Sequence, residues 1–201
     1  MPFDVRPADV FDDVRQIIGP KSATANVCWC LSYRIPSARN SALTGPARGE
    51  LVRELCSRDH APGVLAYEGE TPVGWAGVAP RRELNSFARS RRIPHIDDLD
   101  VWTIWCFRTR AGNRGRGIAR SLLSGAVAFA RDRGAPAVEG YPVDNRGEKV
   151  DLTMAYVGTR KMFEDAGFTC AAETTSVLAG FTRVVMRLDL RASGESSRPS
   201  T

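Results

Sequence analysis

Apolar residues in the first half of this chain follow two spacings, one typical of strands and one typical of helices. Residues 3–6 (FDVR) predict a short strand. Residues 7–18 predict a helix, because their apolar side chains recur every three or four positions after a proline. A second helix is predicted over residues 45–59. Residues 63–69 and 72–80 predict two strands joined by an acidic turn, which is the pattern of a hairpin.

The second half is dominated by one strand and the helix that follows it. Residues 101–110 predict the strongest strand, because they are rich in β-branched and aromatic residues. After a glycine-containing bend, apolar residues from Ile118 to Ala130 recur at helical spacing. Gly134 and Pro136 predict the end of that helix.

Shorter patterns complete the predicted elements. They are a short exposed helix or loop in the basic stretch 81–92, a strand over 135–143, a helix over 154–166, and closing strands over 168–175 and 181–190. Strands and helices that follow one another in this order predict a single α/β (α+β) domain over residues 1–190. Residues 191–201 form a polar tail that we expect to be disordered.

Composition agrees with one soluble domain. The chain has 201 residues, of which 43% are hydrophobic and 25% charged, as is ordinary for a globular protein. The five cysteines are an odd set, and acidic residues stand where a secretory leader would need an apolar stretch. We therefore expect a cytoplasmic protein. Charged and polar residues interrupt every apolar window, so we expect no membrane span.

The net charge of +5 comes almost wholly from arginine, since Lys21, Lys149 and Lys161 are the only lysines. Guanidinium groups bind phosphate with two parallel hydrogen bonds, so an anionic ligand is expected. Nucleic acid is not the expected partner, because the charge is modest and no basic region alternates with aromatic residues.

The bend after the strong strand has the features of an anion site. Gly112, Gly115 and Gly117 let backbone N–H groups converge, and the helix that opens near Gly117 adds unpaired N–H groups and the positive end of its dipole. Arg114 and Arg116 add positive charge. Two known phosphate-binding patterns fail here, because the nucleotide P-loop lacks its Lys-Ser/Thr pair and the dinucleotide G-x-G-x-x-G lacks its last glycine.

A third pattern fits. The residues Arg114-x-x-Gly117-x-Ala119 resemble the R/Q-x-x-G-x-G/A signature of the GNAT N-acetyltransferase superfamily, and FEDAGF at 163–168 resembles the end of the family's later helix. The order of elements is similar from about residue 3 to residue 190. The resemblance implies the GNAT fold, which is a mixed central sheet with splayed middle strands, flanked by helices.

The resemblance also implies how acetyl-CoA binds as co-substrate. The pantetheine arm would lie between the splayed strands, paired with the backbone of Phe107 and Thr109. The pyrophosphate would be held by N–H groups of the bend and helix start, namely Arg114, Gly115, Arg116, Gly117, Ile118 and Ala119. No metal is implied.

Transfer to an amine requires a group that removes the amine proton and one that protonates the leaving thiolate. Asp100 and Glu139 are the carboxylates that we expect nearest the splayed strands. The alternative is that Asp100 caps a strand and that Glu139 is solvated or paired with an arginine. Thr103 stands where some relatives carry a glutamate. Where many relatives carry a tyrosine that protonates the thiolate, this chain has Phe163. Tyr156 is the candidate substitute if it lies on the same face of the predicted helix as residue 163.

The remaining candidates have simpler explanations. Cys106 suggests a covalent intermediate, but the sequence offers it no partner histidine, and Cys28 with Cys30 lacks further ligands for zinc. The acceptor is expected to be a primary amine, and the aromatic content favours a small molecule over a protein. The alternative is a non-catalytic acyl-CoA-binding module. Because homodimers are common among members of the family, a homodimer is compatible with this sequence.

Overall fold

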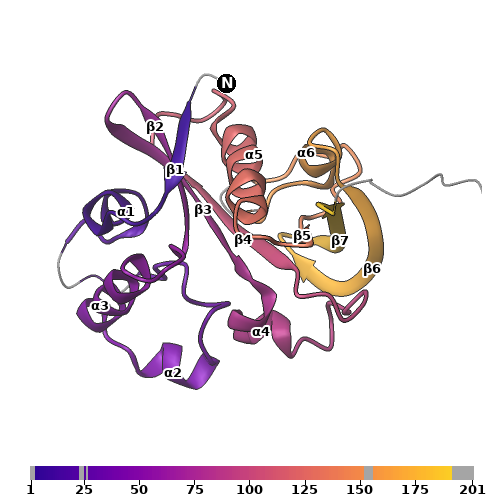
Figure 1. Ribbon diagram of the computed structural model, residues 1–201, viewed down its shortest axis with the longest axis horizontal. Helices are drawn as coiled ribbons and strands as arrows, with labels where there is room; N and C mark the ends of the chain where they lie inside the picture. The colour runs from indigo at the N-terminus through magenta and orange to yellow at the C-terminus, as the bar shows by residue number, and fades with distance from the viewer. Residues whose placement is uncertain (1–2, 23–24, 26, 152–155, 192–201) are drawn as a thin grey trace, which may run out of the picture.

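The computed structural model describes residues 3–22, 25, 27–151 and 156–191. Within these residues, seven strands form one sheet in the order β1-β2-β3-β4-β5-β7-β6 (Figure 1). The strands are β1 (Asp4–Pro7), β2 (Gly63–Glu68), β3 (Thr71–Pro80), β4 (Trp102–Thr109), β5 (Ala137–Gly140), β6 (Thr169–Leu178) and β7 (Phe181–Asp189). The helices are α1 (Phe11–Ile18), α2 (Ser37–Ala42), α3 (Gly45–Cys56), the 3-10 turn η1 (Arg81–Glu83), α4 (Asn85–Ala88), α5 (Ile118–Arg131) and α6 (Arg160–Glu164).

The two middle strands separate part of the way along the sheet. β4 and β5 are parallel, whereas the other neighbouring strands are antiparallel. β4 and β5 pair only over a short stretch, from Trp102 to Ile104 against Val138 to Gly140. Pro142, two residues after the end of β5, has no N–H group to continue the ladder. The mixed sheet with splayed middle strands, flanked by helices, confirms the predicted fold class.

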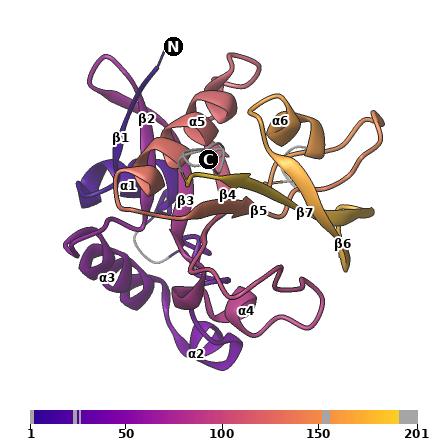
Figure 2. The same ribbon diagram turned by 45° about the vertical axis from the view of Figure 1, so that its right-hand side comes forward.

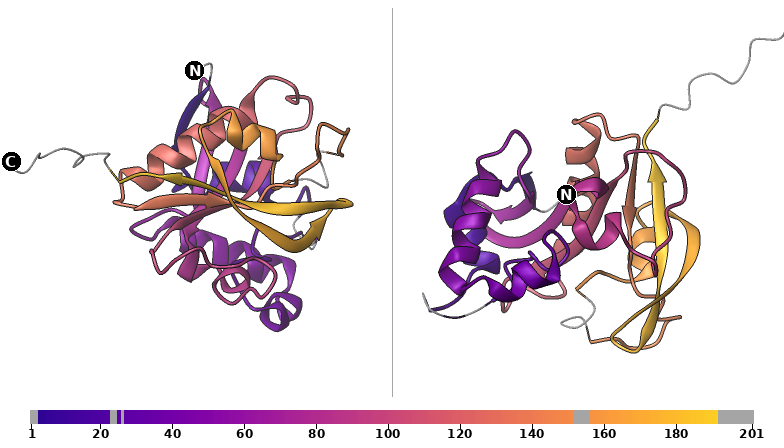
Figure 3. Two further views of the ribbon diagram at one scale, coloured as in Figure 1. Left: turned by 90° about the vertical axis from the view of Figure 1, so that its right-hand side faces the viewer. Right: turned by 90° about the horizontal axis from the view of Figure 1, so that it is seen from below.

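Helices cover both faces of the first four strands. α5 lies on one face, and α1 with α3 lies on the other (Figures 1 and 3). Glycines allow α5 to approach closely: a Cβ at Gly74 of β3 would lie 2.6 Å from Cγ2 of Ile118, and one at Gly125 of α5 would lie 2.3 Å from Cγ1 of Val5. β6 and β7 form a long curved hairpin beyond β5 (Figure 3).

Most elements lie where the sequence predicts them, and the helix after the glycine bend is confirmed at Ile118–Arg131. The helix predicted over 154–166 is wrong in its extent, because α6 begins only at Arg160, after Gly158 adopts a φ of +83°. Residues 152–155 of that prediction lie outside the described residues. The strand predicted over 135–143 ends at Gly140.

The basic stretch 81–92 is not simply an exposed segment. Leu84 and Phe87 are buried, and Arg81 is only 4% exposed. These side chains attach η1 and α4 to the sheet. The many arginines of the stretch had favoured an exposed segment instead. The tail predicted to be disordered lies, from residue 192 onward, outside the described residues. No helix within them combines the length and the apolar character needed to cross a bilayer.

Candidate active site

A cavity of about 460 Å³ opens where β4 and β5 diverge. It lies between the C-terminal end of β4, the start of α5 and the segment leading into α6, three regions that Figure 2 shows grouped at one end of the sheet. Its wall consists of Phe107, Arg108, Thr109, Asn113, Arg114, Gly115, Gly117, Ile118, Ala119, Arg120, Tyr156, Gly158, Thr159 and Met162. The separation of the strands therefore creates an elongated space beside the glycine bend.

The bend itself requires glycine for conformational reasons. Gly112, Gly115 and Gly117 have φ values of +83°, +78° and +82°, in the left-handed region that favours glycine. A Cβ at any of the three would meet nothing within 4 Å, so the backbone is open on this side. Gly117 is the N-cap of α5, and no described side chain caps that end. The first N–H groups of α5 are thus available to an anion.

Seven of the eight residues predicted to bind the cofactor line this cavity, and Arg116 is the exception. The Arg116 side chain pairs with Glu68 at the end of β2 and also donates to Oδ1 of Asn113 at 2.6 Å. These bonds raise the pKa of Arg116 and lower that of Glu68. Arg114 and Arg120 do belong to the wall, and the Arg120 guanidinium lies 3.2 Å from the Asp165 carboxylate.

The exposed edge of β4 already has a partner. The Phe107 N–H group donates to the Tyr156 carbonyl oxygen at 2.7 Å. Phe107 is one of the two residues whose backbone we expected to pair with the pantetheine arm. The segment at Tyr156 therefore occupies part of the edge that a bound arm would use.

Tyr156 lies in the cavity wall. The sequence predicts it in a helix, but the structure places it in a turn before α6. Its hydroxyl is 2.8 Å from the Tyr33 hydroxyl. Burial and the neighbouring Tyr33 hydroxyl raise the pKa of Tyr156 well above its usual range. At neutral pH the group is protonated, and in this arrangement it holds its proton more tightly than an ordinary tyrosine does.

Glu139 lies outside the cavity wall. It is 1% exposed, accepts from Arg81 Nη1 at 3.0 Å and accepts from the Tyr141 hydroxyl at 2.9 Å. Burial and the Glu139 charge raise the pKa of Tyr141. The structure thus matches the simpler of the two explanations that the sequence left open, in which Glu139 pairs with an arginine.

Asp100 also lies away from the cavity. Its side chain is 54% exposed and forms an ion pair with Arg82, in a separate cleft that contains His60. It precedes β4, whereas the cavity begins at Phe107, so about 20 Å of extended chain separates the two. The expectation that Asp100 and Glu139 lie nearest the splayed ends fails because the strands diverge at the opposite end of β4. No described residue in the cavity wall is a carboxylate.

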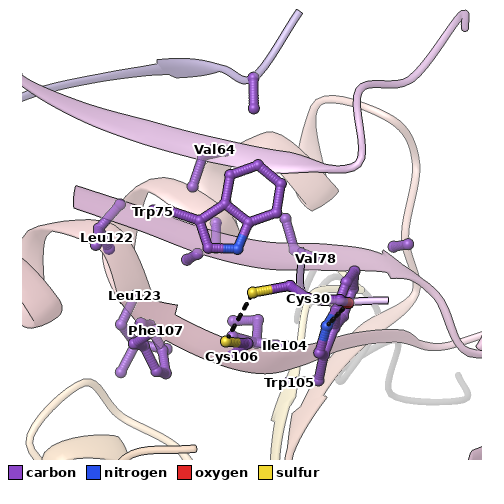
Figure 4. Packing of buried hydrophobic residues seen from close by; sticks show 14 of the residues in the cluster. Cys30, Val64, Trp75, Val78, Ile104, Trp105, Cys106, Phe107, Leu122 and Leu123 are labelled. Atoms are coloured by element: carbon purple, nitrogen blue, oxygen red, sulfur yellow. Dashed lines mark hydrogen bonds between the residues drawn. The ribbon is translucent and has the colours of Figure 1, made fainter. Parts of the chain in front are cut away.

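Cys106 is buried in the core of the sheet. Its Sγ lies 3.1 Å from Sγ of Cys30, beside Trp75 and Trp105 (Figure 4). The Cys106 contact and burial raise the pKa of Cys30, so its thiol is protonated at neutral pH. Neither cysteine belongs to the cavity wall. Within the described residues, no three His, Cys, Asp or Glu side chains gather as a metal site would require.

Replacing Cys106 with alanine is expected to leave the rate of acetyl transfer within about threefold of wild type, because the thiol packs in the core and does not reach the cavity. The small cavity left behind should lower stability by about 1 kcal/mol. Steady-state rates and urea denaturation measure both effects. A loss of turnover with stability intact would instead support a covalent role.

Phe163 is fully buried and does not reach the cavity wall. Its ring packs on Gly140, where an added Cβ would lie 2.2 Å from Cε1 of the ring. It also makes edge contacts with Phe107 and Phe168. In this chain the position therefore supports the core beneath the diverging strands, which suits a phenylalanine.

Sequence reasoning missed part of the cavity wall, in particular Gly158, Thr159 and Met162. A local signal for them exists, because the Thr159 side chain accepts a hydrogen bond from the Met162 N–H group as an N-cap does. A helix predicted to start at residue 154 concealed it. The four tryptophans of the chain are buried, whereas Tyr33 is part-buried and its hydroxyl contacts that of Tyr156.

Comparison with known proteins gives one family and one fold. Residues 33–148 match the acetyltransferase (GNAT) family. Among curated proteins, none matches this sequence.

Three solved structures illustrate the likeness in fold. A GCN5-related N-acetyltransferase from Kribbella flavida is 19% identical with a TM-score of 0.55, over 94% of this chain and 98% of that one. An N-acetyltransferase from Staphylococcus aureus Mu50 is 17% identical with a TM-score of 0.53, over 95% and 100%. The PaiA N-acetyltransferase from Thermoplasma acidophilum, in complex with coenzyme A, is 12% identical with a TM-score of 0.52, over 94% and 99%.

Proposed function

This chain belongs to the acetyltransferase (GNAT) family and is an acyltransferase, and from that premise we propose that it transfers an acetyl group from acetyl-CoA to a primary amine by direct attack. The observation that carries the proposal is the position of the cavity. It joins the opened edge of β4 to the uncapped start of α5, so an extended arm and its anionic end fit side by side. The aromatic cluster around Tyr33 favours a small acceptor over a protein.

The residues at the bend fit a diphosphate. N–H groups at Gly115, Gly117, Ile118 and Ala119 would hold it, because the open backbone lets oxygens approach and the helix dipole adds favourable charge. Arg114 in the wall would add a guanidinium. Arg116 would contribute its backbone only, since its side chain is paired with Glu68.

The pantetheine arm would take the edge of β4 at Phe107 and Thr109. For this the Tyr156 carbonyl has to release the Phe107 N–H group, which would then be free to donate to the bound thioester. Binding of the cofactor and movement of the Tyr156 segment are therefore coupled in this proposal.

The charge of the cavity wall helps to deprotonate the acceptor. A lysine-like amine has a pKa of about 10.4 in water, and nearby cations lower that pKa because they disfavour the ammonium form. Arg108 and Arg114 supply such charge, and no described wall residue is a carboxylate. We propose that water accepts the proton, so that the rate rises with pH until the bound amine is neutral.

Tyr156 is the proposed acid. Its hydroxyl would protonate the thiolate that leaves, once the Tyr33 hydroxyl, which helps to raise its pKa, has moved away. A thiol with a pKa near 8.5 also leaves unaided to some extent, so the acid is expected to accelerate the reaction without being essential.

The Tyr156→Phe variant is expected to lower kcat by about 100-fold, because it removes the proton donor and keeps the ring. Its affinity for CoA should not fall, since the backbone carbonyl that meets Phe107 is retained and the lost bond to Tyr33 frees the segment that has to move. Stopped-flow measurement of thiol release and calorimetry test the two statements. Tyr33→Phe is the matched control: it removes the hydroxyl partner but leaves the acid, and less than a tenfold loss is expected. A Tyr156→Phe enzyme with wild-type kcat would exclude the acid role.

The proposed function is tested by giving the purified protein acetyl-CoA with a panel of amines and measuring free thiol. Release that depends on the amine is expected, together with a mass increase of one acetyl group on the acceptor. Binding of CoA without release for any amine would contradict transfer to an amine. Absence of binding at millimolar CoA would contradict the cofactor assignment itself.

A further inference from the structure

Arg183, near the start of β7, is a buried cation whose charge is not balanced within the described residues. The residue is 4% exposed, and its Nε donates to the Tyr141 carbonyl oxygen at 2.7 Å. Its Nη2 is buried and has no hydrogen-bond partner there, and no carboxylate of the described chain lies within ion-pair distance of the guanidinium. A buried guanidinium in this state is costly, because its lost hydration is not replaced.

Other arginines of low exposure in the described chain are better satisfied. Arg81 is paired with Glu139, and Arg187, four residues along the same strand, is paired with Asp97 through both terminal nitrogens at 2.9 Å. Arg48 has no carboxylate partner, but both of its terminal nitrogens donate to carbonyl oxygens. Arg34 also has a buried Nη2 without a partner, but its Nη1 is paired with Glu83 at 3.3 Å. Among these arginines of the described chain, Arg183 is therefore the one that combines an unpartnered terminal nitrogen with the lack of a carboxylate partner.

The surroundings of Arg183 connect it to the cavity. Its guanidinium carbon lies 5.8 Å from the ring centres of Tyr33 and Phe87, and 5.9 Å from that of Tyr141. The Tyr33 hydroxyl in turn meets the hydroxyl of Tyr156 at 2.8 Å, and Tyr156 belongs to the cavity wall. A single pair of tyrosine side chains thus separates the cation from the space assigned to the thioester.

We propose that Arg183 binds the carboxylate of the acceptor, so that the acceptor is an amine that also carries a carboxylate, such as an amino acid. This inference rests on the proposed function, and it names the substrate class of that same site. A carboxylate supplies the acceptor oxygens that Nη2 lacks, in a setting of aromatic rings where a charge-assisted hydrogen bond is strong. In this proposal the entering acceptor replaces the hydrogen bond between Tyr33 and Tyr156. The Tyr156 hydroxyl is then released toward the leaving thiolate.

The test compares three acceptors that differ in one group: phenylalanine, its amide and phenethylamine. Values of kcat/KM are divided by the fraction of neutral amine at the assay pH, so that differences in amine pKa do not enter. Wild type is expected to prefer the carboxylate about 10- to 100-fold over the amide, as for a hydrogen bond between charged groups. In Arg183→Gln the three kcat/KM values should lie within about threefold of one another. The change should come from a lower kcat/KM for phenylalanine, whereas the values for its amide and for phenethylamine stay the same.

Arg187→Gln is the matched control, because it removes a paired arginine from the same strand and should leave the preference unchanged. Arg183→Lys keeps the positive charge without the planar guanidinium, so it should keep part of the preference for the carboxylate acceptor. If Arg183→Gln does not fold, as thermal melting would reveal, the wild-type enzyme still decides. Phenylpropionate should then inhibit acetylation of phenethylamine at least about tenfold better than phenylpropionamide does.

Equal use of the carboxylate and the amide by wild type, or an unchanged preference in a folded Arg183→Gln, would overturn the inference while leaving acetyl transfer intact. Failure of the proposed function has a different signature, which is the absence of thiol release with every acceptor, phenethylamine included.

Discussion

Gly117→Asp is expected to weaken CoA binding by about 1,000-fold, because its carboxylate would face the diphosphate across the start of α5. Two charges of the same sign about 4 Å apart near a protein surface repel by about 4 kcal/mol. The left-handed φ of +82° adds a smaller cost, which any residue with a Cβ incurs. The space around this position is open, so no steric clash contributes. Calorimetric titration with CoA measures the loss.

Two controls separate charge from backbone strain. Gly117→Asn has the same shape as the aspartate variant and tolerates a left-handed backbone, so it should lose less than about tenfold. Gly180→Asp introduces the same residue at a φ of +84° in the turn between β6 and β7, and should bind CoA as wild type does. If Gly117→Asp and Gly117→Asn bind CoA equally, the phosphates do not lie at this end of α5.

Breaking the Arg81–Glu139 pair is expected to lower the free energy of unfolding by about 3–5 kcal/mol, since a buried charge would lose its partner. The pair joins η1 to β5 beneath the point where β4 and β5 still pair, at the Thr103–Glu139 register. Arg81→Met removes one partner and Arg81→Met with Glu139→Leu removes both. Urea denaturation at pH 7 should place the single variant lowest and the double variant close to wild type, because a well-packed apolar pair replaces the ion pair.

Arg82→Gln is the control on the adjacent residue. Its ion pair with Asp100 is exposed, with 61% and 54% of the two side chains accessible, so a change of less than about 1 kcal/mol is expected. If Arg81→Met is as stable as wild type, the buried pair does not hold the strands together. The same variants should lower acetyl transfer in proportion to the fraction unfolded.

The sequence determined the parts of this protein that depend on neighbouring residues. Apolar spacing from Ile118 to Ala130 fixes α5, and three glycines fix the left-handed bend before it, because both are local properties of the backbone. The bend and the start of α5, residues 113–120, supply seven of the fourteen residues of the cavity wall proposed to hold the cofactor. The N-cap at Thr159 was missed, because the sequence predicted a helix that began earlier, at residue 154.

The tertiary structure alone decided which partner each charged or polar side chain acquires. Arg116 looks equivalent to Arg114 in sequence, but it meets Glu68, 48 residues away, and leaves the cavity. Glu139 meets Arg81 at a separation of 58 residues, and Tyr156 meets Tyr33 at 123. Hydrophobic periodicity carries no information about such pairs, because they form only when the strands assemble in their final order. The fold and its anion site are therefore written in local sequence, whereas the choice of base, acid and acceptor group depends on long-range packing.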